Sequence, residues 1–360
     1  MDTSPAGAST HEAARETLAD RFRAHADDAQ HLYGYALRGM ADDWETGGPV
    51  RVVCGGYENA PHGAVIHLRR LAGVFRLVLT DRAPELVRFY PCFGGNAPAS
   101  QAWPVMRDVI GAHLDEMHAA LAIPPQTNEV GRSAALLAGL FDLVAESGVR
   151  RIRLLEVGAS AGLNLLLDRY AYRGDSWQFG FADSTVQFIN PIEGWVQAEH
   201  FMITDRAGCD LHPVDATTTE GRLLLTSFVW PFDLDRHKRL SLALAIAAAH
   251  PVRIDKASAS RWLRDALTDE LDGLPVVWHS VTQMYWPREE VSAVEEILSR
   301  YGARDLLGEV SLEYAADGPR GAKPELRTRL WNPESGGSIR ERSLGIAHDH
   351  GIPVTLLSSP

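Results

Sequence analysis

Residues 154 to 164 (LLEVGASAGLN) have types and a spacing that fit two kinds of chemistry. An apolar run ends in Glu156 and passes through Gly158 and Gly162 into a helical pattern, as in the first loop of a nucleotide-binding α/β domain. Glycines there let the backbone approach a ligand at a helix N-terminus. Alternatively, Gly158-Ala-Ser160-Ala-Gly162 matches G-x-S-x-G, the strained turn that exposes a hydrolase serine.

An acidic residue further along supports the nucleotide-binding interpretation. In such a sheet the second strand ends in an acid that holds a ribose diol. Asp210, shortly before Pro213, is the candidate. It lies further from Gly162 than the usual spacing of about twenty residues, and its alternative role is to cap the turn that follows.

Polar residues also follow the apolar run at 275–281, where open α/β sheets place their sites. His279 or Tyr285 could orient a substrate or take a proton, although a histidine here can equally be a hydrogen-bonded structural residue. Upstream, the segment 126–132 (QTNEVGR) is rich in hydrogen-bonding side chains. Its Arg132 could pair with a ligand carboxylate, or the segment could be a solvated helix start.

The hydrolase interpretation requires a late histidine, and His348 or His350 satisfies the order. Against it, Glu156 would place a carboxylate beside the nucleophile, and no clear H-G-G-like loop supplies oxyanion donors. The His348-Asp-His350 pattern could bind metal, but the sequence offers no third ligand nearby. We therefore favour the cofactor loop and expect no metal.

The elements that must position these residues differ between the two parts of the chain. Residues 1–125 read as a mostly helical N-terminal cap, with a capping-box pattern at Ser9 and Glu12 and a long helix over about 101–121. Residues 126–360 read as an α/β domain with an insertion near 170–205. The expected strands are 151–157, 252–254, 275–281, 307–312, 326–331 and 353–357, besides the one before Asp210. Helical patterns between several of them predict a mainly parallel sheet, with the last two strands as an antiparallel edge pair.

Composition excludes several classes of partner. The net charge of −12 and the scattered Lys and Arg residues argue against nucleic acid. The three cysteines form no C-x-x-C pair and favour a reducing compartment. The longest apolar run, 240–249, is too short to span a bilayer, and the N-terminus is not a signal peptide. We expect a cytoplasmic protein without a membrane partner.

The motif at 156–164, with the segment 126–132, Val229-Trp-Pro231 and Ala347-His-Asp-His-Gly351, resembles a bacterial family of unknown function. That family is similar to class I S-adenosylmethionine (SAM) methyltransferases. The resemblance implies a Rossmann-like α/β fold with a seven-stranded sheet. It also implies that the first loop contacts the methionine moiety and that the acid of the second strand contacts ribose.

Carried over by position, Glu156, Gly158 and Gly162 match the family's E-x-G-x-G-x-G loop, and Ser160 replaces its middle glycine. The residues expected to bind the cofactor are Glu156, Gly158, Ser160, Gly162, Asn164, Asp210, Asp255, Arg132 and Ser280. Asp255 would lie near adenine after the third strand. His279 and Tyr285 are the catalytic candidates.

The sequence therefore predicts an enzyme that uses SAM on a small molecule, most simply a methyltransferase. No acceptor motif such as D/N-P-P-Y follows the fourth strand. This leaves open a SAM cyclase or lyase that releases methylthioadenosine, a serine hydrolase that uses Ser160, and a non-enzymatic sensor.

Overall fold

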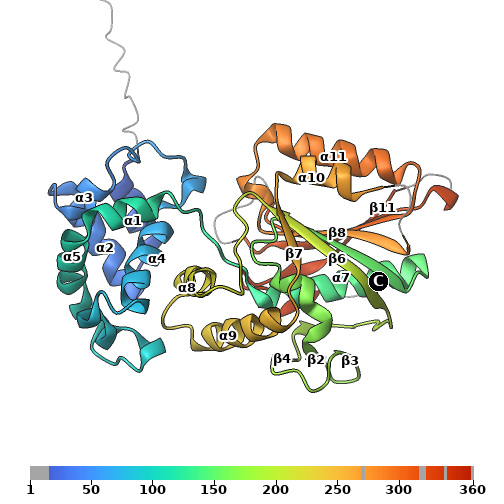
Figure 1. The fold of residues 1–360 in the computed structure, drawn as a ribbon, viewed down its shortest axis with the longest axis horizontal. Helices are drawn as coiled ribbons and strands as arrows, with labels where there is room; N and C mark the ends of the chain where they lie inside the picture. Colours follow the sequence, from blue (N-terminus) through green and yellow to red (C-terminus); the bar gives the residue numbers. More distant parts are fainter. Residues whose placement is uncertain (1–15, 269–271, 316–321, 336–338, 358–360) are drawn as a thin grey trace, which may run out of the picture. The chain divides into compact units, whose positions relative to one another are not determined.

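The computed structural model describes residues 16–268, 272–315, 322–335 and 339–357. The chain divides into two compact units, Met1–Ile123 and Pro124–Pro360. Among the described residues of the first unit the regular elements are all helical (Figure 1). Its α-helices are α1 (Leu18–Ala26), α2 (Leu32–Glu45), α3 (Pro49–Val53), α4 (Ile66–Leu79), α5 (Ala102–Ala112) and α6 (Leu114–Leu121).

Two details of the helical unit differ from the sequence expectation. The single helix expected over 101–121 is instead α5 and α6, because His113 between them has φ −126° and ψ 38°, outside the helical region. The capping-box pattern of Ser9 and Glu12 lies outside the described residues. A capping box is formed by Thr17 and Asp20 at the start of α1.

The second unit is built on a large, mostly parallel sheet of nine strands in the order β5-β12-β11-β10-β9-β8-β1-β6-β7. The strands are β1 (Arg151–Val157), β5 (Ile192–Glu193), β6 (Met202–Asp210), β7 (Arg253–Lys256), β8 (Leu274–Ser280), β9 (Leu307–Glu313), β10 (Glu325–Trp331), β11 (Ile339–Ala347) and β12 (Val354–Leu356). The expectation of seven strands was wrong, and so was the pairing of the last two expected strands. The strand β11 lies between β10 and β12, and its mostly exposed side chains give no apolar alternation to predict it.

The strand order contains a topological switch point. From β1 the chain continues outward to β6 and β7, then returns to the other side of β1 to form β8 and β9, all five strands being parallel. The loops that leave the carboxyl ends of β1 and β8 therefore diverge to opposite sides. Open α/β sheets bind their ligands in this crevice.

Helices cover both faces of this sheet (Figure 1). The helices are α7 (Ser133–Ser147), α8 (Thr219–Ser227), α9 (Leu234–Ala249), α10 (Ala259–Ala266) and α11 (Arg288–Gly302). Leu154 and Val276 pack in one core cluster with α7 and α9, whereas Leu155 and Val277 pack in another with α10 and α11. We call the side of the sheet covered by α7 and α9 the α7 face and the side covered by α10 and α11 the α10 face. Because side chains alternate along a strand, each strand residue can be assigned to one of these faces.

The segment expected as an insertion, 170–205, contains a small three-stranded sheet in the order β3-β2-β4. Its strands are β2 (Ala171–Arg173), β3 (Gln178–Gly180) and β4 (Gln187–Ile189). Aromatic rings hold it together, with Tyr172 stacked on Phe188 at 4.9 Å between centroids.

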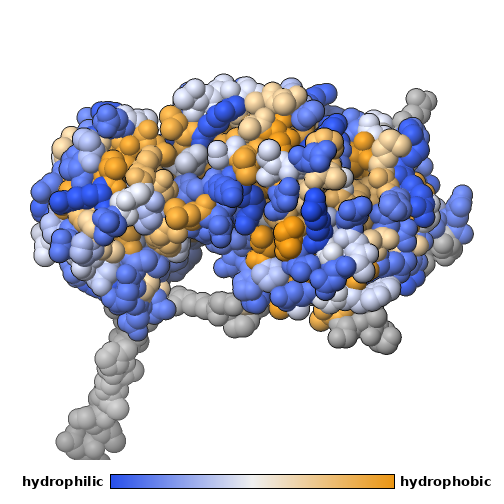
Figure 2. Space-filling model, turned by 90° about the horizontal axis from the view of Figure 1, so that it is seen from below, coloured by the Kyte–Doolittle hydropathy of each residue, from blue (hydrophilic) through white to orange (hydrophobic). Residues whose placement is uncertain are grey.

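Apolar and polar residues are interspersed on the molecular face drawn in Figure 2. Within the described residues, every helix is too short or too polar to cross a bilayer.

Candidate functional site

The loop after β1 has the backbone of a glycine-rich loop at each of its three key positions. Gly158, Ser160 and Gly162 have φ of 73°, 53° and 72°, the left-handed region that disfavours side chains. A Cβ on Gly158 would lie 2.5 Å from Thr282 Oγ1, and one on Gly162 would lie 2.6 Å from Val252 Cγ2. Both glycines are therefore required by conformation and by close packing, while Ser160 tolerates the position of the motif's middle glycine at some cost in strain.

The backbone N–H groups of this loop are all used within the protein. Their acceptors are the Cys209 carbonyl for Gly158 (2.9 Å) and Ala159 (3.0 Å), an Asp210 carboxylate oxygen for Ser160 (2.9 Å), the Asn128 amide oxygen for Ala161 (3.2 Å) and Leu163 (2.9 Å), and the Ala159 carbonyl for Gly162 (2.7 Å). A pyrophosphate is normally bound by free donors of this kind at a helix N-terminus. The loop therefore lacks the donors of a dinucleotide site.

The element after the loop also differs from the α-helix that the pattern after Gly162 predicts. It is a 3₁₀ helix, η6 (Leu163–Arg169), interrupted by non-helical angles at Leu166. The Asn128 side chain occupies the start of η6, where the sequence alone placed a ligand. Asn128 belongs to the segment 126–132, which is thus part of the loop's framework.

Asp210 connects β6 with the loop after β1. One carboxylate oxygen accepts from the Ser160 N–H, and the other accepts from the His212 N–H at 2.8 Å. The bond from His212 is the turn cap that the sequence offers as one role of Asp210, and the other expected role, contact with a ribose diol, is compatible with its position. Asp210 is half-buried, and a carboxylate can accept further hydrogen bonds.

Glu156, the last acidic residue of β1, is buried beside the loop. It is 2% exposed, and this burial raises the pKa of its carboxyl to about 8, although Asn164 offsets part of the rise. Glu156 Oε2 and Asn164 Oδ1 are buried and make no well-formed hydrogen bond among the described residues, although the side chains of Asn164 and Trp278 both interact with Glu156 and lower its pKa. With this pKa the carboxyl carries a proton at neutral pH, and a nearby cation or N–H donor would stabilise its ionised form, so this position favours a ligand that carries N–H groups or positive charge.

Arg132 supplies the opposite charge at the same edge of the sheet. Its guanidinium donates to the carbonyl oxygens of Ser280 (3.4 Å) and Asp349 (3.2 Å). In the described parts of the chain no carboxylate lies within ion-pair distance of it, yet its charge lowers the pKa of Glu156. The charges of Glu129 and Glu313 act on Arg132 from beyond ion-pair distance, so its guanidinium can still pair with a ligand carboxylate near Glu156.

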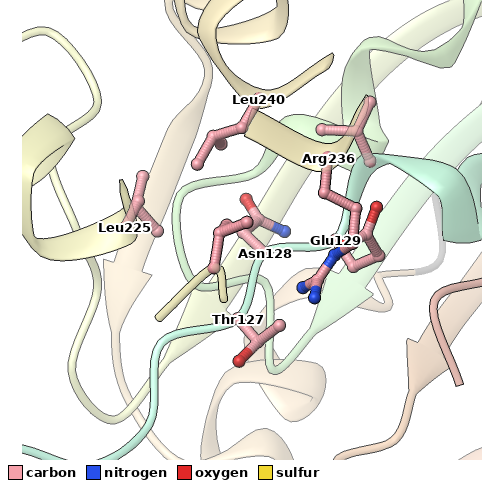
Figure 3. A pocket seen from close by; sticks show the side chains of 8 residues that line it. Thr127, Asn128, Glu129, Leu225, Arg236 and Leu240 are labelled. Carbon is pink, nitrogen blue, oxygen red and sulfur yellow. The ribbon is translucent and has the colours of Figure 1, made fainter. Parts of the chain in front are cut away.

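A buried ion pair that sequence reasoning missed anchors the segment 126–132. Glu129 accepts from Arg236 Nε at 2.6 Å and from Arg239 at 3.2 Å, and these two cations hold the pKa of its carboxyl below the usual value despite burial. Figure 3 shows Glu129 beside Arg236. The pocket next to them has a volume of about 10 Å³, roughly that of one water, and is too small for the proposed ligand.

The structure places His279 away from this loop. Glu156 pairs in register with Trp278, so Glu156, Trp278 and Ser280 share the α7 face whereas His279 lies on the α10 face. Its ring nitrogens bond to Glu313 (2.9 Å) and Glu309 (3.3 Å). Burial alone would lower the pKa of His279, but the two carboxylates raise it to about 9. The ring is therefore a charged structural group at neutral pH, and a role as general base has no geometric support.

The remaining candidates divide between the two faces. Ser280 meets Arg132 through its carbonyl, and Tyr285 is exposed on η7 (Gln283–Tyr285). Asp255 pairs in register with Cys209, so it lies on the α10 face, where it bonds to Arg253 and Trp262, each at 2.9 Å. Asp255 is thus not brought to the face that carries Asp210 and Glu156.

Ser160 lacks the partner that a hydrolase nucleophile needs. Its hydroxyl donates to Gln126 Oε1 at 2.5 Å, whereas His350 Nε2 lies beside Arg236 and His348 Nε2 beside Lys323, each at 3.3 Å. Among the residues that the structure describes, no histidine is therefore positioned to take its proton. Within the described residues no group of three or more His, Cys, Asp or Glu side chains could hold a metal ion.

We expect that a fluorophosphonate probe will not label Ser160 in the folded protein, because the hydroxyl is bound to an amide and not to a base. Intact-mass analysis of the probe-treated protein measures this, with Ser160→Ala as the control. Labelling of the wild type that the control abolishes would contradict this account and restore the hydrolase.

Comparison with known protein families shows which family this chain belongs to. A family model described as an uncharacterized protein conserved in bacteria, DUF2332, matches residues 15–355. The chain belongs to the DUF2332 family. Neither the comparison with curated proteins nor that with solved structures found a match. The DUF2332 match spans both units, so the helical unit and the sheet unit are parts of one family architecture.

Proposed function

We propose that the sheet unit binds SAM at the carboxyl ends of β1, β6 and β8 and uses it on a small molecule, most simply by methyl transfer. The observation that carries the proposal is the charge pattern beside the first loop. Two buried oxygens without a well-formed hydrogen bond, Glu156 Oε2 and Asn164 Oδ1, lie in the electrostatic range of Arg132, a cation with no carboxylate within ion-pair distance in the described chain. An α-amino acid carries the complementary ammonium and carboxylate groups.

The glycine-rich loop limits which other chemical groups the ligand can carry. Because the N–H groups of residues 158–163 are already bonded, the loop does not suit a pyrophosphate. Asp210 stands where the acid of a second strand holds a ribose diol. A nucleoside joined to an amino acid without phosphate, as in SAM, satisfies these conditions together.

When bound, SAM supplies an electrophilic methyl group for a nucleophilic acceptor. In this proposal Glu156, Asn164 and Arg132 hold the amino-acid arm, and Asp210 holds the ribose. Trp230, Met284 and Tyr285 are exposed apolar residues in loops that follow strands or helices of this unit and are candidates to line an acceptor site. Positioning then provides most of the rate enhancement.

A second candidate is a cyclase or lyase, in which the amino-acid arm of SAM itself reacts and methylthioadenosine leaves. The observation that favours it is the position of His279. This residue lies on the α10 face, opposite to Glu156, and both of its ring nitrogens are bonded to carboxylates there. The strand that was expected to supply an acceptor's base therefore supplies no free histidine.

We expect SAM incubated with the pure protein and no acceptor to remain intact, because methyl transfer needs a second substrate. Chromatography of the mixture against a protein-free control measures this. Methylthioadenosine formed at a rate proportional to enzyme concentration would contradict methyl transfer and favour the cyclase or lyase. Saturable binding of S-adenosylhomocysteine tests the proposal as a whole.

A further inference from the structure

The loop after β8 is held by a single carboxylate at the end of the neighbouring strand. Glu313, the last residue of β9, accepts hydrogen bonds from the backbone N–H of Thr282 (3.1 Å) and of Gln283 (3.3 Å). It also accepts from His279 Nδ1 at 2.9 Å. Hydrogen bonds to a charged acceptor are stronger than neutral ones, so Glu313 fixes the loop at its beginning.

The loop is bent in a way that needs such a restraint. Val281, between β8 and Thr282, has φ 48°, an unfavourable conformation for a β-branched residue. Strain of this kind persists only where the surroundings enforce it, and it concentrates at functional sites.

The bend brings the loop after β8 against the loop after β1. Thr282 lies very close to Gly158. A Cβ added to Gly158 would be 2.5 Å from Thr282 Oγ1 and 2.9 Å from Thr282 Cβ. The two loops that diverge at the topological switch point are thus in direct contact. A shift of Thr282 would change the support of the glycine loop.

The charges behind Glu313 are arranged in a row on the α10 face. His279 bonds to both Glu313 and Glu309, and Glu309 is paired with Arg329. Arg329 also pairs with Glu295 of α11 at 2.7 Å, where both side chains reach the surface. The positive charges of His279 and Arg329 alternate with the carboxylates, and these two cations hold the pKa of the buried Glu309 below its usual value.

We propose that Glu313, oriented by His279, is a positioning residue that holds the loop 281–285 against the glycine loop and so sets the affinity of the site. Glu313 does this through Thr282, without contact with the ligand. The inference rests on the proposed function only for the identity of the ligand; the restraint of the loop stands on the contacts above.

The test compares Glu313→Ala, Glu313→Gln and Glu295→Ala in the full chain. We expect Glu313→Ala to weaken binding of S-adenosylhomocysteine about tenfold by calorimetry, and to speed hydrogen exchange of the Thr282 and Gln283 amides. Glu313→Gln keeps an acceptor for these amides, but an uncharged and weaker one, and should recover only part of both effects. Glu295→Ala removes a carboxylate at the far end of the same row and should match the wild type.

Three outcomes overturn the inference: wild-type affinity in a folded Glu313→Ala protein, an equal loss in Glu295→Ala, or unchanged exchange of the two amides. If Glu313→Ala does not fold, Glu313→Gln must still show faster exchange than Glu295→Ala. If the wild type does not bind S-adenosylhomocysteine, the proposed function fails. In that case the hydrogen-exchange measurement by itself still tests whether Glu313 restrains the loop 281–285.

Discussion

Replacing Asp210 with alanine is expected to weaken the binding of S-adenosylhomocysteine about a hundredfold, or roughly 2.7 kcal/mol. The change removes the acceptor of the Ser160 and His212 N–H groups, which join the loop after β1 to the end of β6. Each hydrogen bond to a charged group contributes roughly 1.5–3 kcal/mol. The proposed ribose contact is lost as well. Isothermal titration calorimetry on both proteins at one pH measures the difference.

The matched control for this change is Asp215→Ala. Asp215 lies five residues later and is exposed, and its carboxylate accepts from the N–H and the hydroxyl of Thr217 within its own turn. The helix α8 that follows is capped by Thr218 and not by Asp215. Asp215→Ala should bind as the wild type does, and equal affinity of Asp210→Ala and Asp215→Ala would contradict a role for Asp210 in the site.

Replacing Glu156 with glutamine is expected to change stability and binding in opposite directions. The folded pKa of about 8 exceeds the unfolded value of about 4.3. Between these values the folded carboxyl keeps a proton that the unfolded chain releases, so wild-type stability falls as pH rises through this range. Glu156→Gln lacks this loss and should be the more stable protein at pH 8, with the difference vanishing near pH 4.

The same substitution should weaken the binding of S-adenosylhomocysteine about tenfold or more, since a neutral amide replaces the carboxyl proposed to accept from the ligand's ammonium. Urea unfolding at several pH values and calorimetry at pH 8 measure the two effects. Higher stability with weaker binding is the expected result if the buried acid lowers the stability of the protein but is needed to bind the ligand. Lower stability of Glu156→Gln at pH 8, or unchanged affinity, would argue that Glu156 is purely structural.

Glu129→Gln is the matched control, because it makes the same chemical change at another buried acid. Glu129 is paired with Arg236 and Arg239, which lower its pKa. Its neutralisation removes the carboxylate that both arginines share and leaves Arg236 with Asp233 at 3.6 Å. Breaking a buried ion pair in this way costs about 3 kcal/mol or more. The two Glu→Gln variants should therefore have stability changes of opposite sign at pH 8.

Local sequence patterns were sufficient to locate the core of the sheet and its first loop. Alternating or continuous apolar runs marked β1, β8, β9 and β10, and glycine spacing marked the turn in which Gly158 and Gly162 have positive φ. The strand β11 was missed because its side chains are mostly exposed and charged. Its neighbours, and not its own hydrophobicity, determine that it is a strand.

Contacts between distant side chains could not be predicted in the same way. Asn128 bonds to the glycine loop from 33 and 35 residues away, and Glu129 pairs with Arg236 across 107. The face on which His279 lies depends on the register of β8 against β1, since a shift of one residue would reverse it. Residue types identified His279 as able to do chemistry, but only the register showed that it meets Glu309 and Glu313.

The most direct test of the proposed function is calorimetric titration of the full chain with S-adenosylhomocysteine and, in parallel, with NAD⁺. The charge pattern of Glu156, Asn164 and Arg132, together with the bonded loop N–H groups, predicts saturable binding of S-adenosylhomocysteine and none of the dinucleotide. Binding of NAD⁺, or the absence of binding by S-adenosylhomocysteine, would contradict the account.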